Sequence, residues 1–412
     1  MLKIAHTADW HLRDSQFSRS DRSDDFYAAA MSVINQCTDC DVILHSGDLL
    51  DVTRPSAHVM QQVRKLDSKL RELGIPMLVI SGNHDKTPKA GWMDAVASQQ
   101  SARATDLART CLAAVRLGAD LSSGPPPEDC IRKGTPQSFG GIINADMGYF
   151  LVSDAEGKDV VSIMGLPYMP RRDFLNFFDT AVVIPKSDIL MWHAQLSEMF
   201  GFCNENAASV EDFPQNAFQF VAMGDIHVPT SLQRASDQLR IAYCGSIEMC
   251  NMTEPFEKTF DVYTFHDGKL GAREPRVIEL NRTPVEAFIT ELDAVETLRH
   301  LYETEFLPTD RKSTLRLLIP KEFEDQLKVV RSFVDLNTTI VLPYITGAAK
   351  NKDDLEQELR QTSVKPIKDY VPAWFPAGSP LVGVCQDLCD PTKNPADVAA
   401  VFEQTRLGVT IS

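Results

Sequence analysis

The chain has 412 residues with a formal net charge of -16, and 43% of its residues are hydrophobic. This length predicts two or three domains that bury their own cores without disulfides or a structural metal. The acidic excess disfavours a protein that coats nucleic acid, because phosphate binding needs Lys and Arg, but it allows a local basic groove or an acidic metal site.

The sequence carries no sign of a membrane span or of export. It has no run of 18 uninterrupted apolar residues, and its N-terminal segment lacks the apolar core and cleavage site of a signal peptide. The nine cysteines are scattered, which fits a reducing compartment better than a disulfide framework. We therefore expect a cytoplasmic protein.

The first 85 residues alternate between short apolar strands and helices. Apolar segments predict strands at residues 2–7, 42–45 and 75–80. Apolar residues at helical spacing predict helices through residues 26–34 and 59–73. Strand, helix, strand, helix and strand in succession predict a layered α/β domain with parallel strands.

Further strands are expected along the middle of the chain, and a helical stretch and a proline-rich loop interrupt them. The helical stretch covers residues 92–117, and the loop covers residues 124–127. The predicted strands are at residues 160–166, 189–192, 220–223, 241–243 and 260–265.

Composition shifts after about residue 275, where a second β-α-β-α-β pattern begins. Its predicted elements are a strand at 277–280, a helix at 284–302, a strand at 315–319, a helix at 321–334 and a strand at 338–342. A polar spacer and a proline-rich segment follow, and a short amphipathic helix near residues 394–405 closes the chain. We therefore expect three parts, at residues 1–272, 273–348 and 349–412.

Five short segments place metal-ligand residue types directly after predicted strands. They supply Asp9 with His11, Asp48, Asn83 with His84 and Asp85, His193, and Asp225 with His227. In open α/β sheets, sites form outside the carboxyl ends of the strands, so we expect these side chains to converge. Helix capping by isolated Asp and Asn residues is the simpler alternative, but five such segments make it a poor one.

The chemistry of these side chains predicts a catalytic metal centre. Seven of them are potential ligands that offer oxygen or imidazole nitrogen without thiolate, which favours manganese, iron, magnesium or zinc in a catalytic role. Seven ligands exceed the needs of one four-coordinate ion and suit two cations about 4 Å apart that share a bridging carboxylate.

Asp-x-His, Gly-Asp, Gly-Asn-His-Asp, a lone His and Gly-x-x-His, in this order, resemble the calcineurin-like metallophosphoesterases. The forms Asp9-Trp10-His11-Leu12 and Tyr243-Cys244-Gly245-Ser246-Ile247-Glu248 resemble the SbcD-type nuclease subunits of DNA double-strand-break repair complexes. This resemblance implies a four-layer β-sandwich flanked by helices, a small α/β capping domain and a short C-terminal helical tail.

The resemblance also implies roles for the individual residues. Asp48 would bridge two divalent cations, most simply manganese, with magnesium as the alternative. His84 would protonate the leaving oxygen, and Asp85 would orient His84 or its loop. The first cation would take Asp9, His11, Asp48 and His227, and the second would take Asp48, Asn83, His193 and Asp225.

One position departs from the common family pattern, because Asp225 stands where a histidine is usual. The extra carboxylate is expected to favour hard cations such as manganese or magnesium. A degenerate, inactive site is the alternative. Asp51 is expected either to orient a ligand or to cap a helix.

Several other residues have simpler readings. His6 and His45 are expected in the core. Cys37 and Cys40 have metal-ligand spacing but no second pair, so a zinc or redox role is not favoured.

Basic residues near these segments are candidates for contacts to DNA phosphates. Arg13, Arg54, Lys86 and Lys89 are the main ones. Arg19, Arg22, Arg171 and Arg172 are weaker candidates. Acidic residues interleave with them, so a solvated mixed-charge surface is an equal alternative.

The leading hypothesis is a metal-dependent DNA exonuclease and endonuclease in DNA repair or recombination. The resemblance implies an SbcC-type SMC-like coiled-coil ATPase as partner, docked on the C-terminal tail, and a homodimer, with no membrane partner. Two alternatives stay open at this point. One is a phosphomonoesterase or cyclic-nucleotide phosphodiesterase, and the other is a DNA-end-binding scaffold with weak catalysis.

Overall fold

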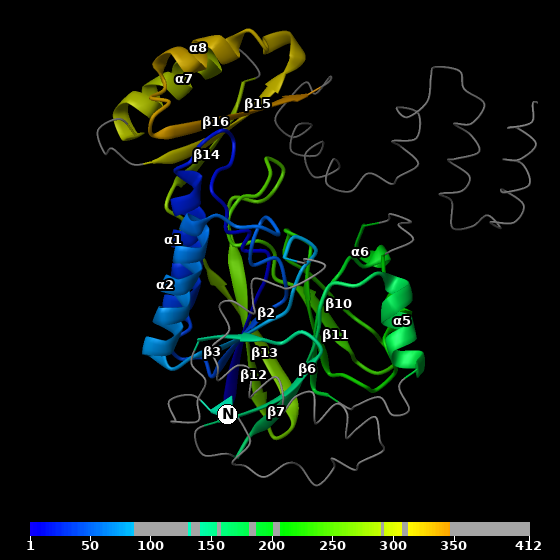
Figure 1. Ribbon diagram of the computed structural model, residues 1–412. Coiled ribbons are helices and arrows are strands. Elements are labelled where there is room, and N and C mark those ends of the chain that lie inside the picture. The colour runs from blue at the N-terminus through cyan, green and yellow to red at the C-terminus, as the bar shows by residue number, and fades with distance from the viewer. Residues whose placement is uncertain are drawn as a thin grey trace, which may run out of the picture.

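The computed structural model describes residues 1–85, 131–132, 141–154, 158–180, 187–200, 207–289, 292–306 and 312–346. Figure 1 shows two facing sheets with helices outside them, and a smaller sheet with its own helices at one end. The predicted helix at 92–117, the loop at 124–127 and the segment 349–412 lie outside the described residues, as do Lys86 and Lys89.

The first sheet has six strands in the order β13-β12-β1-β2-β3-β5. Strands β1, β2, β3 and β5 are parallel, and β12 and β13 extend the sheet as an antiparallel pair. Their bounds are β1 Leu2–Thr7, β2 Val42–His45, β3 Pro76–Val79, β5 Gly141–Asn144, β12 Thr259–His266 and β13 Lys269–Val277.

The second sheet has seven strands in the order β10-β11-β9-β8-β7-β6-β4. Strands β7, β8, β9 and β11 are parallel. The bounds are β4 Ile131–Arg132, β6 Gly148–Ser153, β7 Val160–Leu166, β8 Ile189–His193, β9 Phe220–Gly224, β10 Thr230–Gln233 and β11 Arg240–Tyr243.

Three apolar cores join these sheets and helices into four layers. Successive residues of a strand point to opposite faces, so Ile43 packs toward the helices while Leu44 packs between the two sheets. Helices α1 (Arg22–Gln36) and α2 (Ala57–Leu73) cover the first sheet. Helix α5 (Arg171–Thr180) covers the second, where the Phe174 and Trp192 rings stack with centroids 3.8 Å apart. The expected four-layer α/β sandwich is confirmed.

The smaller sheet is parallel, in the order β14-β15-β16, with α7 and α8 packed on it. Its elements are β14 Thr283–Phe288, α7 Leu292–Leu301, β15 Ser313–Pro320, α8 Gln326–Phe333 and β16 Thr339–Thr346. We call residues 283–346 the cap. The predicted β-α-β-α-β succession is present, although the chain division at residues 272 and 348 stays a prediction.

The first strand of the cap was predicted in the wrong place. Val277 ends β13 in the first sheet, and residues 284–288, predicted as the start of a helix, lie in β14. Pairing along β15 from Ser313 to Leu318 outweighs the helical signal of this segment. Pro284 fits there because β14 is an edge strand, where a missing N–H leaves no ladder partner unpaired.

The cap contacts the body through charged and apolar groups. Arg316 of β15 donates to the carbonyl oxygens of Met252 at 2.9 Å and Glu254 at 2.8 Å. Arg282, just before the cap, donates to Thr338 O of the cap at 2.9 Å and pairs with Asp25 and Asp21 of the body. An apolar cluster of cap and body residues lies beside them, made of Met249, Ile340 and Leu342.

Candidate metal centre

The predicted site residues meet where the parallel strands of both sheets end. Backbone hydrogen bonds tie the loops after β1 and β2 together, from Asp9 N to Gly47 O at 3.0 Å and from His11 N to Asp48 O at 3.0 Å. His193 ends β8, and Asp225 follows β9 on the neighbouring strand. Two layers of the fold thus contribute to one site.

Four of the predicted ligands have a left-handed backbone. Their φ angles are 53° at Asp9, 43° at His11, 56° at Asp48 and 96° at Asp225. Such a conformation costs about 1–3 kcal/mol for a residue with a side chain, and it clusters at functional sites. The left-handed backbone conformation directs these four side chains toward a common centre.

The glycines of the motifs allow the close approach of the strand ends. A Cβ at Gly47, whose φ is 96°, would lie 2.3 Å from His193 Nδ1. A Cβ at Gly82 would lie 2.0 Å from a carboxylate oxygen of Asp48. Any side chain at either position would therefore displace a candidate ligand.

One group of ligand atoms surrounds His193. Together with carboxylate oxygens of Asp9 and Asp48 it forms a group whose atoms all lie within 4.8 Å of one another. His193 Nε2 lies 2.9 Å from Asn83 Oδ1 and 3.6 Å from Asp225 Oδ1. The Nδ1–H of His193 donates to the carbonyl oxygen of Ser46 at 2.8 Å, which directs Nε2 toward these oxygens.

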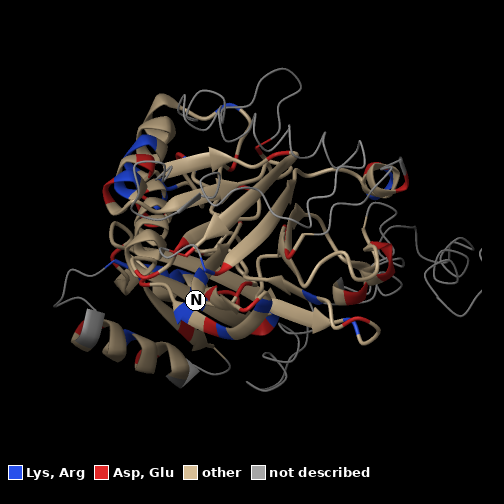
Figure 2. Cartoon of the chain, turned by 90° about the horizontal axis from the view of Figure 1, so that it is seen from below, with Lys and Arg blue, Asp and Glu red and all other residues tan. Residues whose placement is uncertain are grey.

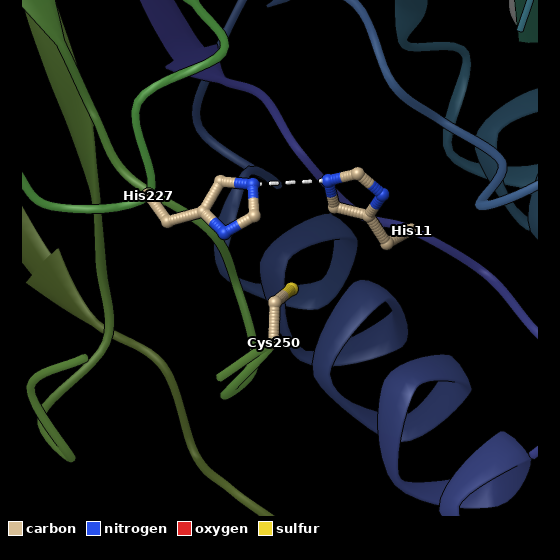
Figure 3. A group of neighbouring side chains, drawn as sticks. All are labelled: His11, His227 and Cys250. Atoms are coloured by element: carbon tan, nitrogen blue, oxygen red, sulfur yellow. Dashed lines mark hydrogen bonds between the residues drawn. The ribbon is translucent and has the colours of Figure 1, made fainter. Parts of the chain in front are cut away.

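A second group surrounds His11. Its Nε2 lies 3.1 Å from Nε2 of His227, and 3.6 Å from Oδ2 of Asp48, which also lies 3.5 Å from His193 Nε2. Asp48 therefore stands between the two groups, as a bridging carboxylate must. Figure 3 shows the two imidazoles facing each other across this end of the site.

Asp225 lies in the site although it departs from the common pattern. Its backbone N–H donates to both carboxylate oxygens of Asp9, at 3.1 and 3.3 Å, and its side chain faces His193. The carboxylate thus lies among the other candidate ligands, and its effect on metal preference stays a prediction.

Glu254 supports the site and was not singled out from the sequence. Its side chain is buried, and Oε1 accepts a hydrogen bond from His227 Nδ1 at 2.7 Å. Oε2 accepts from Lys258 Nζ at 2.6 Å and from Ser246 Oγ at 2.9 Å. A carboxylate behind a ligating histidine fixes the tautomer and raises ligand basicity. No spacing rule marks Glu254, because it lies in an irregular loop.

His84 stands at the open side of the centre, with 42% of its side chain exposed. Its Nδ1–H donates to the carbonyl oxygen of Asp51 at 2.7 Å, and its backbone N–H donates to Asp48 Oδ1 at 3.0 Å. The Asp51 carboxylate lies 3.4 Å from His11 Nδ1. Since Ser56 caps helix α2, the ligand-orienting reading of Asp51 fits the structure.

Asp85 is buried and accepts three backbone hydrogen bonds. The donors are Leu49 N at 3.1 Å, Leu50 N at 2.9 Å and Gly82 N at 3.1 Å. Its carboxylate therefore joins the loops after β2 and β3, which carry Asp48 and His84. Asp85 was expected to orient either His84 or its loop, and this geometry fits a role in orienting the loop.

Burial and mutual charge shift the acids and imidazoles of the metal-free site. Burial raises the pKa of Asp9 to about 7 and that of Asp85 to about 6. Burial opposes charging of His227, but Cys250 and Glu254 outweigh it and raise the pKa of His227 to about 11. In the metal-free site, Asp9 and His227 thus tend to hold protons, and a bound cation would displace these protons.

His6 and His45 are core residues, as expected. Both are fully buried, and burial lowers the pKa of each to about 3. Cys37 and Cys40 are also buried, and within the described part of the chain they belong to no group of potential metal ligands.

The basic residues near the site differ in their surroundings. Arg13 is paired with Asp51 at 2.8 Å, and Arg22 is fully buried against Asp25, so Arg22 is not a phosphate contact. Arg54 is exposed. Seen from below, basic and acidic residues are interspersed over the described elements (Figure 2), as the mixed-charge alternative predicts.

Among the described residues, no helix is long and apolar enough to span a membrane.

Comparison with known proteins identifies relatives of this chain. The model of the calcineurin-like phosphoesterase family matches residues 2–229. Three of the most similar curated proteins are DNA double-strand break repair proteins Mre11. The one from Haloferax volcanii is 26% identical over 269 residues, which cover 64% of this chain and 50% of the relative. The one from Methanosarcina acetivorans is 34% identical over 271 residues, 64% of this chain and 36% of the relative.

The third, from Saccharolobus solfataricus, is 34% identical over 99 residues, 23% of this chain and 25% of the relative. The chain thus spans half or less of the length of these relatives.

Proposed function

The chain belongs to the calcineurin-like phosphoesterase family, and from this premise we propose that it is a DNA nuclease that hydrolyses phosphodiester bonds with two divalent cations. One observation carries the proposal. The Asp48 carboxylate lies between two groups of ligand atoms, 3.6 Å from His11 Nε2 and 3.5 Å from His193 Nε2, with His84 on the open side.

The residues present suit such cations. The Nε2 atoms of His11 and His227 are 3.1 Å apart, a distance at which two bare lone pairs repel unless a proton or a cation lies between them. Since Glu254 takes the Nδ1–H of His227, the Nε2 atom is the one left to ligate. Buried carboxylates beside it supply the negative charge that a divalent cation needs.

In the proposed assignment, Asp48 is shared by the two positions. Asp9, His11 and His227 would complete the first, although Asp9 also lies within 4.8 Å of ligand atoms of Asp48 and His193. Asn83, His193 and Asp225 would complete the second. The cations, when bound, lower the pKa of water and offset charge on the phosphate. Three carboxylates among seven ligands favour manganese, with magnesium as the hard-cation alternative.

His84 donates the proton that the leaving oxygen needs. The carbonyl oxygen of Asp51 holds its Nδ1–H, so Nε2 is the atom that gives up a proton on the open side of the site. Asp85 fixes the loop that carries His84 through its three backbone hydrogen bonds.

DNA is the proposed substrate because the relatives are named as DNA double-strand break repair proteins. We extend the proposal to exonuclease and endonuclease activity together with an SbcC-type SMC-like coiled-coil ATPase that docks on residues 349–412. We also propose that the protein forms a homodimer and acts in the cytoplasm. Arg54, Lys86 and Lys89 are proposed phosphate contacts, whereas Arg13 is held by Asp51.

The test is a manganese-dependent assay on linear duplex DNA, single-stranded DNA and a small phosphodiester. His84→Ala should lose DNA cleavage but keep manganese binding, since its imidazole is not among the assigned ligands. His58→Ala, on the exposed surface of α2, is the matched control and should keep both. Cleavage of the small substrate without DNA cleavage would overturn the nuclease proposal, whereas full DNA cleavage by His84→Ala would overturn the role of His84 as the proton donor.

A further inference from the structure

Cys250 brings a sulfur atom to the His11 and His227 end of the metal centre. Its Sγ and one ring nitrogen of each histidine all lie within 4.8 Å of one another. Figure 3 shows the sulfur pointing toward the two imidazoles. The sequence predicted a ligand set without thiolate, so this donor is not part of the two-cation assignment.

The spacing of these atoms suits a small tetrahedral cation. Donor atoms that share one zinc ion lie about 3.3–3.8 Å apart, given bonds of about 2.0–2.3 Å. The two Nε2 atoms are 3.1 Å apart, and the sulfur lies within 4.8 Å of one ring nitrogen of each histidine. Rotation about the Cα–Cβ bond of one cysteine adjusts a difference of that size.

The segment that carries the cysteine is held from three sides. The Cys250 N–H donates to Glu254 Oε2 at 3.0 Å, and its carbonyl oxygen accepts from Gln16 Nε2 at 2.7 Å. Arg316 of the cap donates to Met252 O two residues on. The thiol makes a long contact of 3.6 Å to Glu248 O and also interacts with the His227 imidazole, so the sulfur already lies beside a proposed ligand.

We propose that Cys250 makes this end of the centre a site for thiophilic divalent cations, zinc above all, with His11, His227 and the Cys250 thiolate as ligands. A metal–sulfur bond forms while the thiol proton passes to solvent. Thiolate with imidazole selects zinc, whereas manganese prefers oxygen ligands. Zinc therefore displaces manganese from this end.

This inference rests on the proposed metal centre but not on DNA as the substrate. Cobalt(II) replaces zinc as the spectroscopic probe, and the full chain is titrated with it in the absence of manganese. The wild type should show ligand-field bands together with a thiolate-to-cobalt charge-transfer band. Cys250→Ser should keep the ligand-field bands and lose the charge-transfer band.

The matched control is Cys40→Ser, which removes a buried thiol from the only described cysteine pair with metal-ligand spacing. It should keep the charge-transfer band. Cys250→Ser should also lower zinc affinity by about tenfold or more, because loss of a group that only supports a ligand already has an effect of that size. Its manganese affinity should change by less than about twofold. X-ray absorption of the zinc-loaded chain should show one sulfur neighbour at about 2.3 Å, absent from Cys250→Ser.

The possible failures are distinguishable. If the wild type binds no cobalt, the proposed metal centre itself is wrong. If it shows ligand-field bands without a sulfur band, or if Cys250→Ser keeps that band while Cys40→Ser loses it, the centre stands and the role of Cys250 is refuted.

Discussion

Replacing Glu254 with glutamine tests how the protein holds His227. The Glu254 carboxylate accepts hydrogen bonds on both oxygens. Oε1 takes them from His227 Nδ1 and from the backbone and side chain of Asn251. Oε2 takes them from Lys258 Nζ, Ser246 Oγ and the Cys250 N–H. An amide nitrogen cannot accept, so glutamine loses the partners on one side whichever way it turns.

The expected magnitude follows from burial. Glu254 and Lys258 each have 2% of their side chain exposed, and removing one partner of a buried ion pair costs about 3–5 kcal/mol. Loss of a carboxylate that supports a ligating histidine lowers metal affinity by about 10- to 100-fold. We therefore expect Glu254→Gln to weaken both the fold and manganese binding.

Two assays separate these effects. Denaturant unfolding with a chelator present reports the metal-free stability, and calorimetric titration reports manganese affinity. Glu248→Gln is the matched control, because Glu248 is equally buried but contacts Arg22 and the Met249 N–H rather than a candidate ligand. It should lose stability and keep metal affinity. Equal manganese affinity in Glu254→Gln and the wild type would show that Glu254 does not support His227 as a ligand.

Three further predictions follow from the same geometry. Because burial raises the pKa of Asp9 to about 7, above its unfolded value of 3.8, Asp9 holds a proton below pH 7 that a cation must displace. Manganese binding should therefore release about one more proton at pH 6 than at pH 8, measured by calorimetry in two buffers, and an equal count would contradict this. Gly47→Ala should disturb His193 and abolish binding at that end of the centre, whereas Gly268→Ala, which also has positive φ but has no atom within 4 Å of its Cβ position, should cost stability alone. If the two variants bind manganese alike, close packing at Gly47 is unimportant. Arg316→Ala should leave the Met252 and Glu254 carbonyl oxygens without their donor, costing about 1–3 kcal/mol in denaturant unfolding. Its manganese affinity should also fall, because Glu254 loses an anchor, and unchanged affinity would show that the cap does not support the centre.

Strands and helices with a clear apolar pattern were predicted well from the sequence. The strands β1, β2 and β7 and the helices α1 and α2 lie where the apolar periodicity placed them. Each buries a face of several apolar residues, so local pattern and tertiary packing agree.

Several strands were missed, including the apolar β5 and β6, and two of the missed strands, β13 and β14, have weak local signals. Strand β13 has a largely exposed run of charged residues, and it forms because its backbone pairs with β12 across a tight turn at Gly268. Strand β14 was read as helix because its pairing partner on β15 is distant in sequence. Long-range backbone pairing of this kind leaves little trace in composition.

Part of the candidate site could also be predicted from the sequence, and part could not. Its ligands follow directly from residue type at strand ends, which the sequence displays. Its supporting groups, Glu254 and Cys250, come from an irregular loop that tertiary contacts with the cap and with Gln16 hold in place. No periodicity or spacing could reveal that this loop reaches the candidate ligands.

The most direct test of the account is the number and coupling of manganese ions bound to one chain. Metal analysis after equilibrium dialysis, read together with low-temperature electron paramagnetic resonance, measures both quantities. The wild type should hold about two ions that are magnetically coupled through a shared bridge. Asp48→Asn should lose the coupling, because Asp48 lies between the His11 and His193 groups. A single uncoupled ion in the wild type, or full coupling in Asp48→Asn, would contradict a centre built on that carboxylate.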